Sequence, residues 1–74
     1  MSIKIETLDN KKGCLIEGNI FKATDKSGKS YKYRYEGIDP TQENGYCIHL
    51  HNLDSDTETY VEKEWFRQRK IVIF

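Results

Sequence analysis

The chain has 74 residues, a mass of 8.8 kDa, and twelve basic side chains that balance twelve acidic ones. A folded surface of roughly 4,800 Å² against roughly 12,800 Å² unfolded leaves room for one core, so we expect a single domain over residues 1–74 and no large enclosed active site. Aromatic and β-branched residues exclude a disordered chain, and no apolar run approaches the roughly 20 residues that span a membrane.

The first third of the chain alternates short apolar segments with turn signals. Ile3 and Ile5 alternate with charged neighbours, which is the period of a strand. Residues 9–13 combine Asn and Gly in a turn, and a longer apolar stretch then runs over 14–23. Gly18 interrupts that stretch, and a glycine there often marks a bulge or a sharp bend.

The middle of the chain holds two clear alternations. After a turn over 25–29, three tyrosines alternate with charged residues and predict a strand over 31–35. A polar loop over 37–45 carries the only proline. The run 46–51 alternates again and predicts the next strand.

The last third of the chain is less decided. A polar turn over 52–56 precedes a β-branched run over 57–61, which favours a strand. The segment 62–70 is too short to be classified by its apolar spacing. A short helix or 3₁₀ turn within 62–69 and an extended segment are therefore both open, before a terminal apolar strand over 71–74.

These elements predict a protein that is all-β, or β-rich with one short helical turn. Five to six strands at intervals of 8–14 residues, joined by connections of hairpin length, favour an antiparallel meander. We expect a small antiparallel barrel or a strongly bent sheet, SH3-like in appearance. That likeness concerns the fold alone and implies no function.

The charges are unevenly distributed along the chain. Residues 1–35 carry +4 (eight bases, four acids), residues 36–64 carry −7 (one base, eight acids) and residues 65–74 carry +3 (three bases). Either strand pairing brings opposite charges together, or the blocks form two poles that steer a partner. The zero net charge argues against strong non-specific nucleic-acid binding, but it permits a local basic patch.

The tyrosine strand is the first candidate contact surface. Side chains alternate between the two faces of a strand, so Tyr31, Tyr33 and Tyr35 cover either the core or a partner while the intervening bases face the other way. Three tyrosine hydroxyls in a dry core each need a hydrogen-bond partner. We therefore expect at least one of these tyrosines near the rim of the core.

The second candidate contact surface is Trp65 with Arg67 and Arg69, the densest aromatic–basic cluster in the chain. Trp, Tyr and Arg are the residues most enriched at binding hot spots. The alternative is that the single indole anchors the core of so small a domain.

A third candidate site is Cys47, His49 and His51, which share one face of the predicted strand at steps of about 6.7 Å. Imidazole and thiolate bind transition metals, with Cys14 or a carboxylate as the fourth ligand. The alternative is an ordinary polar strand face, because the paired Cys-x-x-Cys spacing of a zinc site is missing from the sequence.

The apolar run 71–74 has no polar face of its own. It is either buried on both sides or lies at a sheet edge, where unpaired backbone groups invite a homodimer or a partner strand.

We expect a small non-catalytic binding module that acts through protein–protein contact, as an adaptor, regulator or inhibitor of a larger machine. The alternative is a nucleic-acid-binding barrel, which requires the bases of the first 35 residues and of 67–70 to converge on one face with exposed aromatics. We expect no cofactor and no membrane partner. Two cysteines and the lack of an apolar leader after Met1 favour the cytoplasm.

Overall fold

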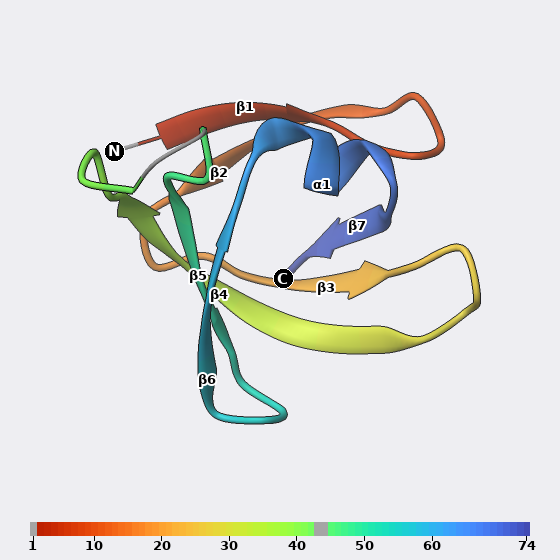
Figure 1. The fold of residues 1–74 in the computed structure, drawn as a ribbon. Helices are drawn as coiled ribbons and strands as arrows, with labels where there is room; N and C mark the ends of the chain where they lie inside the picture. Colours follow the sequence, from red (N-terminus) through yellow and green to blue (C-terminus); the bar gives the residue numbers. More distant parts are fainter. Residues whose placement is uncertain (1, 43–44) are drawn as a thin grey trace.

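The computed structural model describes residues 2–42 and 45–74, which form two antiparallel sheets and one short helix (Figure 1). The elements in chain order are β1 (Ser2–Glu6), β2 (Lys12–Ile16), β3 (Ile20–Thr24), β4 (Ser30–Ile38), β5 (Ile48–Asn52), β6 (Thr57–Val61), α1 (Lys63–Arg67) and β7 (Lys70–Ile73). Strands β1 and β2 form a separate hairpin, and the other five lie in the order β6-β5-β4-β3-β7.

The apolar stretch 14–23 divides into β2 and β3 at Gly18, whose positive φ of 95° lets the chain turn sharply. The Gly18 N–H donates to the Tyr35 carbonyl at 2.8 Å, so this turn is fixed against β4. The predicted bend is therefore present. The division explains why the described residues form seven strands where the sequence predicted five to six.

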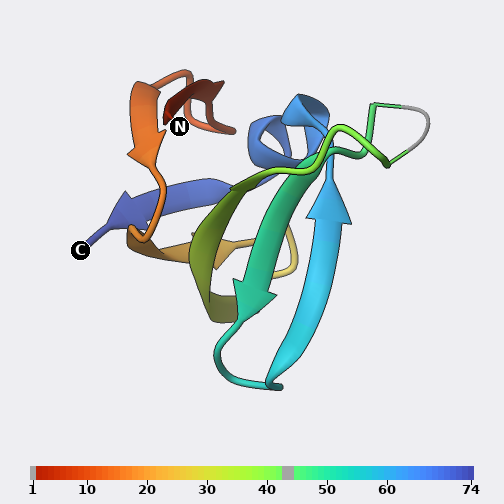
Figure 2. The same cartoon turned by 90° about the vertical axis from the view of Figure 1, so that its left-hand side faces the viewer.

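The larger sheet is bent but does not close into a barrel. Four strands, β3 to β6, form a meander, and β7 returns to pair with β3. Within the described residues β6 and β7 are the two edges of this sheet and do not pair with each other. The expectation of a bent antiparallel sheet holds, and a closed SH3-like barrel is not found. The β1–β2 hairpin and α1 cover one side of the sheet instead (Figures 1 and 2).

One apolar core lies between the sheet, the hairpin and α1. Its buried side chains are Ile5, Leu15, Phe21, Ala23, Tyr33, Tyr35, Ile48, Leu50, Val61 and Phe66. Phe66 comes from α1, and the others come from the inward faces of the strands, because side chains alternate between the two faces of a strand. The accessible surface is 4865 Å², close to the area expected for the mass.

For the segment 62–70 the sequence left a short helix and an extended segment open. The structure has a helix over Lys63–Arg67, followed by β7. Glu62 is its N-cap and Phe66 is its buried residue. No helix within the described ranges is long and apolar enough to cross a membrane.

The predicted strand 46–51 is wrong at its start, since β5 begins at Ile48. Gly45 has a positive φ of 77°, which turns the backbone just before Tyr46.

Candidate functional site

Helix α1 separates two surface hollows of opposite charge. The first, here called the acidic groove, has a volume of about 380 Å³ and is lined by Tyr46, Thr59, Tyr60, Val61, Glu62, Glu64, Trp65 and Gln68. The second, here called the basic cleft, has a volume of about 340 Å³ and is lined by Lys4, Ile5, Glu6, Lys12, Gly13, Lys63 and Arg67. Residues four apart share a helix face, so Lys63 and Arg67 face the cleft together while Glu64 faces the groove.

Three aromatic side chains form the walls of the acidic groove. Tyr46 is 46% exposed. The Tyr60 ring stacks on His49 with the ring centroids 4.6 Å apart. The half-buried Trp65 packs edge-on against Tyr33, with the ring centroids 5.1 Å apart. Two of the three rings are thus held in place by side chains behind them.

Arg69 also contacts the indole of Trp65. Its guanidinium carbon lies 4.2 Å from the centroid of the Trp65 ring, which is a cation–π contact. Its Nη1 also donates a hydrogen bond to the Trp65 carbonyl oxygen at 3.0 Å. Arg69, predicted as a contact residue, therefore holds Trp65 in the position observed.

The charged lining of the acidic groove is of one sign. Glu62 and Glu64 line it, and none of the lining residues that the structure describes is basic. Glu64 also accepts a hydrogen bond from Arg67 Nη1 at 3.3 Å, so one ion pair links the two hollows across α1. A groove with aromatic walls and carboxylates suits a cationic occupant, because both attract positive charge.

The groove contains residues that the sequence did not single out, namely Tyr46, Tyr60, Glu62 and Glu64. No protein-family model, curated protein or solved structure matches this chain. The signal available in the sequence is the spacing of Glu58, Tyr60, Glu62 and Glu64, in which acidic and aromatic residues occupy every second position. Joining that run to Tyr46 required the folded sheet.

The predicted contact residues are spread over different parts of the molecule. Tyr33 and Tyr35 are buried in the core and present no free surface, because the inward face of β4 carries both. Tyr31 is 40% exposed and meets the predicted rim position. Arg67 lies in the basic cleft, on the other side of α1 from the acidic groove that Trp65 lines.

The two histidines lie together on the outer face of β5, where acidic side chains bind them. His51 Nδ1 lies 2.8 Å from Glu58 Oε1, and its Nε2 lies 2.8 Å from Asp56 Oδ1. Because carboxylates only accept, this arrangement suits an imidazolium that donates from both nitrogens. The hydrogen bond to Glu58 raises the pKa of His51, and the same bond lowers the pKa of Glu58.

Cys47 stands apart from these histidines at the end of the preceding loop, with its Sγ 3.7 Å from the Gly45 carbonyl oxygen. Across residues 2–42 and 45–74, no group of three or more His, Cys, Asp or Glu side chains is arranged to hold a metal ion. His49 and His51 thus lie on a polar face of β5 and are bound by carboxylates, whereas Cys47 precedes that strand.

The apolar C-terminal run forms β7, an edge strand in the described structure. Val72 and Phe74 are exposed, and Lys32 Nζ lies 5.7 Å from the centroid of the Phe74 ring. The predicted homodimer through this strand stays a prediction.

Proposed function

We propose that this protein is a non-catalytic binding module that holds a basic segment of a partner protein in the acidic groove. In this role it would act as an adaptor, regulator or inhibitor of a larger protein assembly. The observation that carries the proposal is the lining of the groove, with three aromatic residues and two carboxylates and no basic residue among them.

Two physical arguments support the proposal. Aromatic rings offer a large apolar area at small entropic cost, and they attract cations through their faces. Rings that are already held by neighbours, as Tyr60 is by His49 and Trp65 by Arg69, lose less freedom when a ligand binds. Binding should therefore combine apolar contact with charge selection.

The proposal extends to the fold and the compartment. We suggest that the five-stranded sheet is an open relative of SH3-like small barrels, supported by the β3–β6 meander, the helical turn α1 and the return of β7 to β3. Such a likeness leaves the function to be argued from the site. The free thiols of Cys14 and Cys47 support a reducing cytoplasm.

The proposal is tested by titration with defined peptides. The probe is a ten-residue peptide of arginines, leucines and glycines, and its counterpart has glutamate at each arginine. Trp65 is the only tryptophan in the chain, so its fluorescence reports binding at the groove. We expect the arginine peptide to shift the Trp65 emission and the glutamate peptide to leave it unchanged. Mass spectrometry of the recovered peptide should show an unchanged mass.

Charge variants locate the binding site. Glu62→Gln and Glu64→Gln should each raise the Kd for the arginine peptide about two- to fivefold, as expected for an exposed ion pair. Glu6→Gln is the matched control, since it makes the same change in net charge inside the basic cleft. Equal weakening by all three variants would show that only net charge matters, and the groove assignment would be wrong.

The nucleic-acid alternative has partial geometric support. Lys4 and Lys12 from the first 35 residues do converge with Arg67 in one cleft. No aromatic side chain lines that cleft, so the stacking platform of a single-strand binder is missing from it.

A further inference from the structure

We propose that the basic cleft is a binding site for adjacent phosphate groups of a small anionic ligand. The cleft is a separate site from the acidic groove, and none of its lining residues lines that groove. The inference therefore stands independently of the peptide-binding proposal.

The cleft has cationic side chains on two opposed walls. The hairpin supplies Lys4 from β1 and Lys12 from β2, and α1 supplies Lys63 and Arg67. Among the described lining residues Glu6 is the only carboxylate, so four cations face one anion and their formal charge is +3. All four basic side chains are exposed and reachable from solvent.

These cations have few partners of their own. Within residues 2–42 and 45–74, the ammonium groups of Lys4, Lys12 and Lys63 form no ion pair with a carboxylate. Arg67 forms an ion pair with Glu64 through Nη1, which lies 3.3 Å from Glu64 Oε2. Its guanidinium has further N–H groups that can donate to a ligand. Uncompensated like charges repel one another, and an anion between them removes that repulsion.

Phosphate is the anion that best matches this set. Arginine binds phosphate oxygens through its planar fork, and lysine binds phosphate as a compact point charge. A charge of +3 divided between two walls matches two or three neighbouring phosphates better than one carboxylate. The cleft volume of about 340 Å³ falls at the lower end of the range for small-molecule sites.

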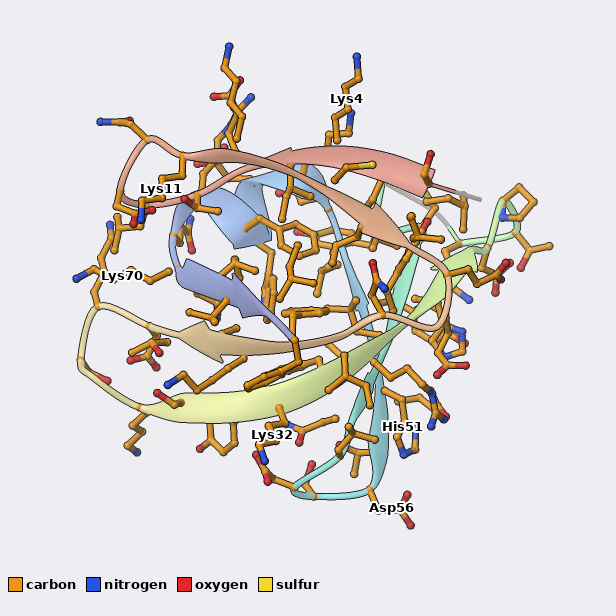
Figure 3. The ribbon with its side chains drawn as sticks, turned by 180° about the vertical axis from the view of Figure 1, so that it is seen from behind. Lys4, Lys11, Lys32, His51, Asp56 and Lys70 are labelled. Carbon is orange, nitrogen blue, oxygen red and sulfur yellow. The ribbon has the colours of Figure 1, made fainter. Side chains whose placement is uncertain are left out.

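A small ligand is favoured over a nucleic-acid strand by what surrounds the cations. No aromatic ring lines the cleft to stack a base. The neighbouring Lys11 is already paired with Asp9 at 3.8 Å, and Asp9 also interacts with Lys70. Figure 3 shows Lys4 on the hairpin and Lys11 and Lys70 at the adjoining end of the molecule. Four cations therefore line the cleft, while Lys11 and Lys70 beside it interact with Asp9.

The experiment is an NMR titration of the whole chain with sodium tripolyphosphate, with orthophosphate, and with a ten-nucleotide single-stranded DNA, at constant ionic strength. We expect tripolyphosphate to shift the amide signals of Gly13, Lys63 and Arg67 in a saturable manner. Orthophosphate should bind about tenfold more weakly, because it brings fewer charges into the cleft. The Trp65 emission should not change, which distinguishes this site from the acidic groove.

Variants on the two walls test the assignment. Lys12→Gln and Arg67→Gln should each raise the tripolyphosphate Kd about fivefold. The matched control is Lys29→Gln, an exposed lysine in the β3–β4 turn outside the cleft lining. All three side chains are exposed, and well-dispersed amide spectra check that each variant is folded.

Three results would overturn the inference. The first is no saturable shift at the cleft with tripolyphosphate. The second is equal weakening in Lys29→Gln and Arg67→Gln, which would indicate binding to the general charge of the molecule. The third is tighter binding of the DNA than of tripolyphosphate with the same shifted amides, which would assign the cleft to a nucleic-acid backbone.

Discussion

At the scale of single residues, Gly37 has a backbone conformation that other residues rarely adopt. Its φ is +107°, and it lies at the register shift between β4 and β5. A Cβ added there would lie 3.2 Å from Glu17 Cδ. We predict that Gly37→Ala lowers the free energy of unfolding by about 1–2 kcal/mol through backbone strain, measured by urea denaturation.

Gly13→Ala is the control for that prediction. Gly13 has no positive φ, and a Cβ at this position would make an ordinary 3.7 Å contact with Ile5 Cγ1. We expect a change in stability within about 0.5 kcal/mol, as for most surface substitutions. If both glycine variants lose the same stability, the positive φ of Gly37 is not the cause.

At the scale of secondary structure elements, the end of α1 depends on one side chain. Arg69 binds the Trp65 ring and the Trp65 carbonyl oxygen together. Arg69→Met keeps an apolar stem but removes the cation–π contact and the hydrogen bond, each worth about 1 kcal/mol. We predict a loss of about 1–2 kcal/mol in stability and a red-shifted Trp65 emission.

The same variant separates positioning from direct contact. Arg69→Met removes a positive charge from the protein. If Arg69 acts on the groove by positioning Trp65, this variant should nevertheless bind the arginine peptide with a higher Kd. Removing a positive charge from a surface that attracts cations should otherwise strengthen binding. Tighter binding of the peptide by Arg69→Met would contradict the positioning role.

The sequence predicted the strands because alternation is a local property. It separated the tyrosines of β4 from the intervening bases correctly, but it left open which face would meet the core. That choice depended on Phe21 and Trp65, which pack against Tyr33 from β3 and α1. The helix was undecided for the same reason, since burial of Phe66 against Phe21 is a tertiary contact.

The acidic groove and the basic cleft could not be predicted from the sequence at all. Each is built from segments that are far apart in the sequence, such as Tyr46 with Trp65 or Lys4 with Arg67. The blocks of charge were visible in the sequence, but a block does not say which side of a helix its residues take. Helix α1 places Lys63 and Glu64, neighbours in the chain, in hollows of opposite charge.

At the scale of the whole molecule, the basic and acidic blocks of the sequence are partly mixed in space. Figure 3 shows Lys4, Lys11 and Lys70 toward the hairpin, while Lys32, from the first basic block, lies at the far end of the larger sheet with His51 and Asp56. Some pairing across strands also occurs, since Glu58 lies opposite His51 in the register of β5 and β6. The structure therefore shows pairing of charges across strands, and the two-pole alternative stays a prediction.

This arrangement makes stability depend on pH in two directions. Side-chain hydrogen bonds lower the pKa of four carboxyl groups, those of Asp9, Asp25, Asp39 and Glu58. A group with a lowered pKa stabilises the fold above its ordinary pKa, 3.8 for Asp and 4.5 for Glu, and loses this contribution as the pH falls. His51 has a raised pKa, so it stabilises the fold below its ordinary value of 6.5 and loses that contribution as the pH rises through the raised value.

The carboxylates and His51 therefore both stabilise the fold in full only between pH 4.5, the ordinary pKa of Glu58, and pH 6.5, the ordinary pKa of His51. We predict that the free energy of unfolding is greatest in this window and falls on either side. In His51→Gln the free energy of unfolding should fall less above pH 6.5. Most of its fall at acid pH should remain, because the three aspartates are unchanged. Urea denaturation at half-unit steps from pH 3 to pH 9, followed by Trp65 fluorescence, measures the fall on both sides. An alkaline fall that persists in His51→Gln would mean that another group titrates there, and that the carboxylates around His51 do not set the stability of this end of the sheet.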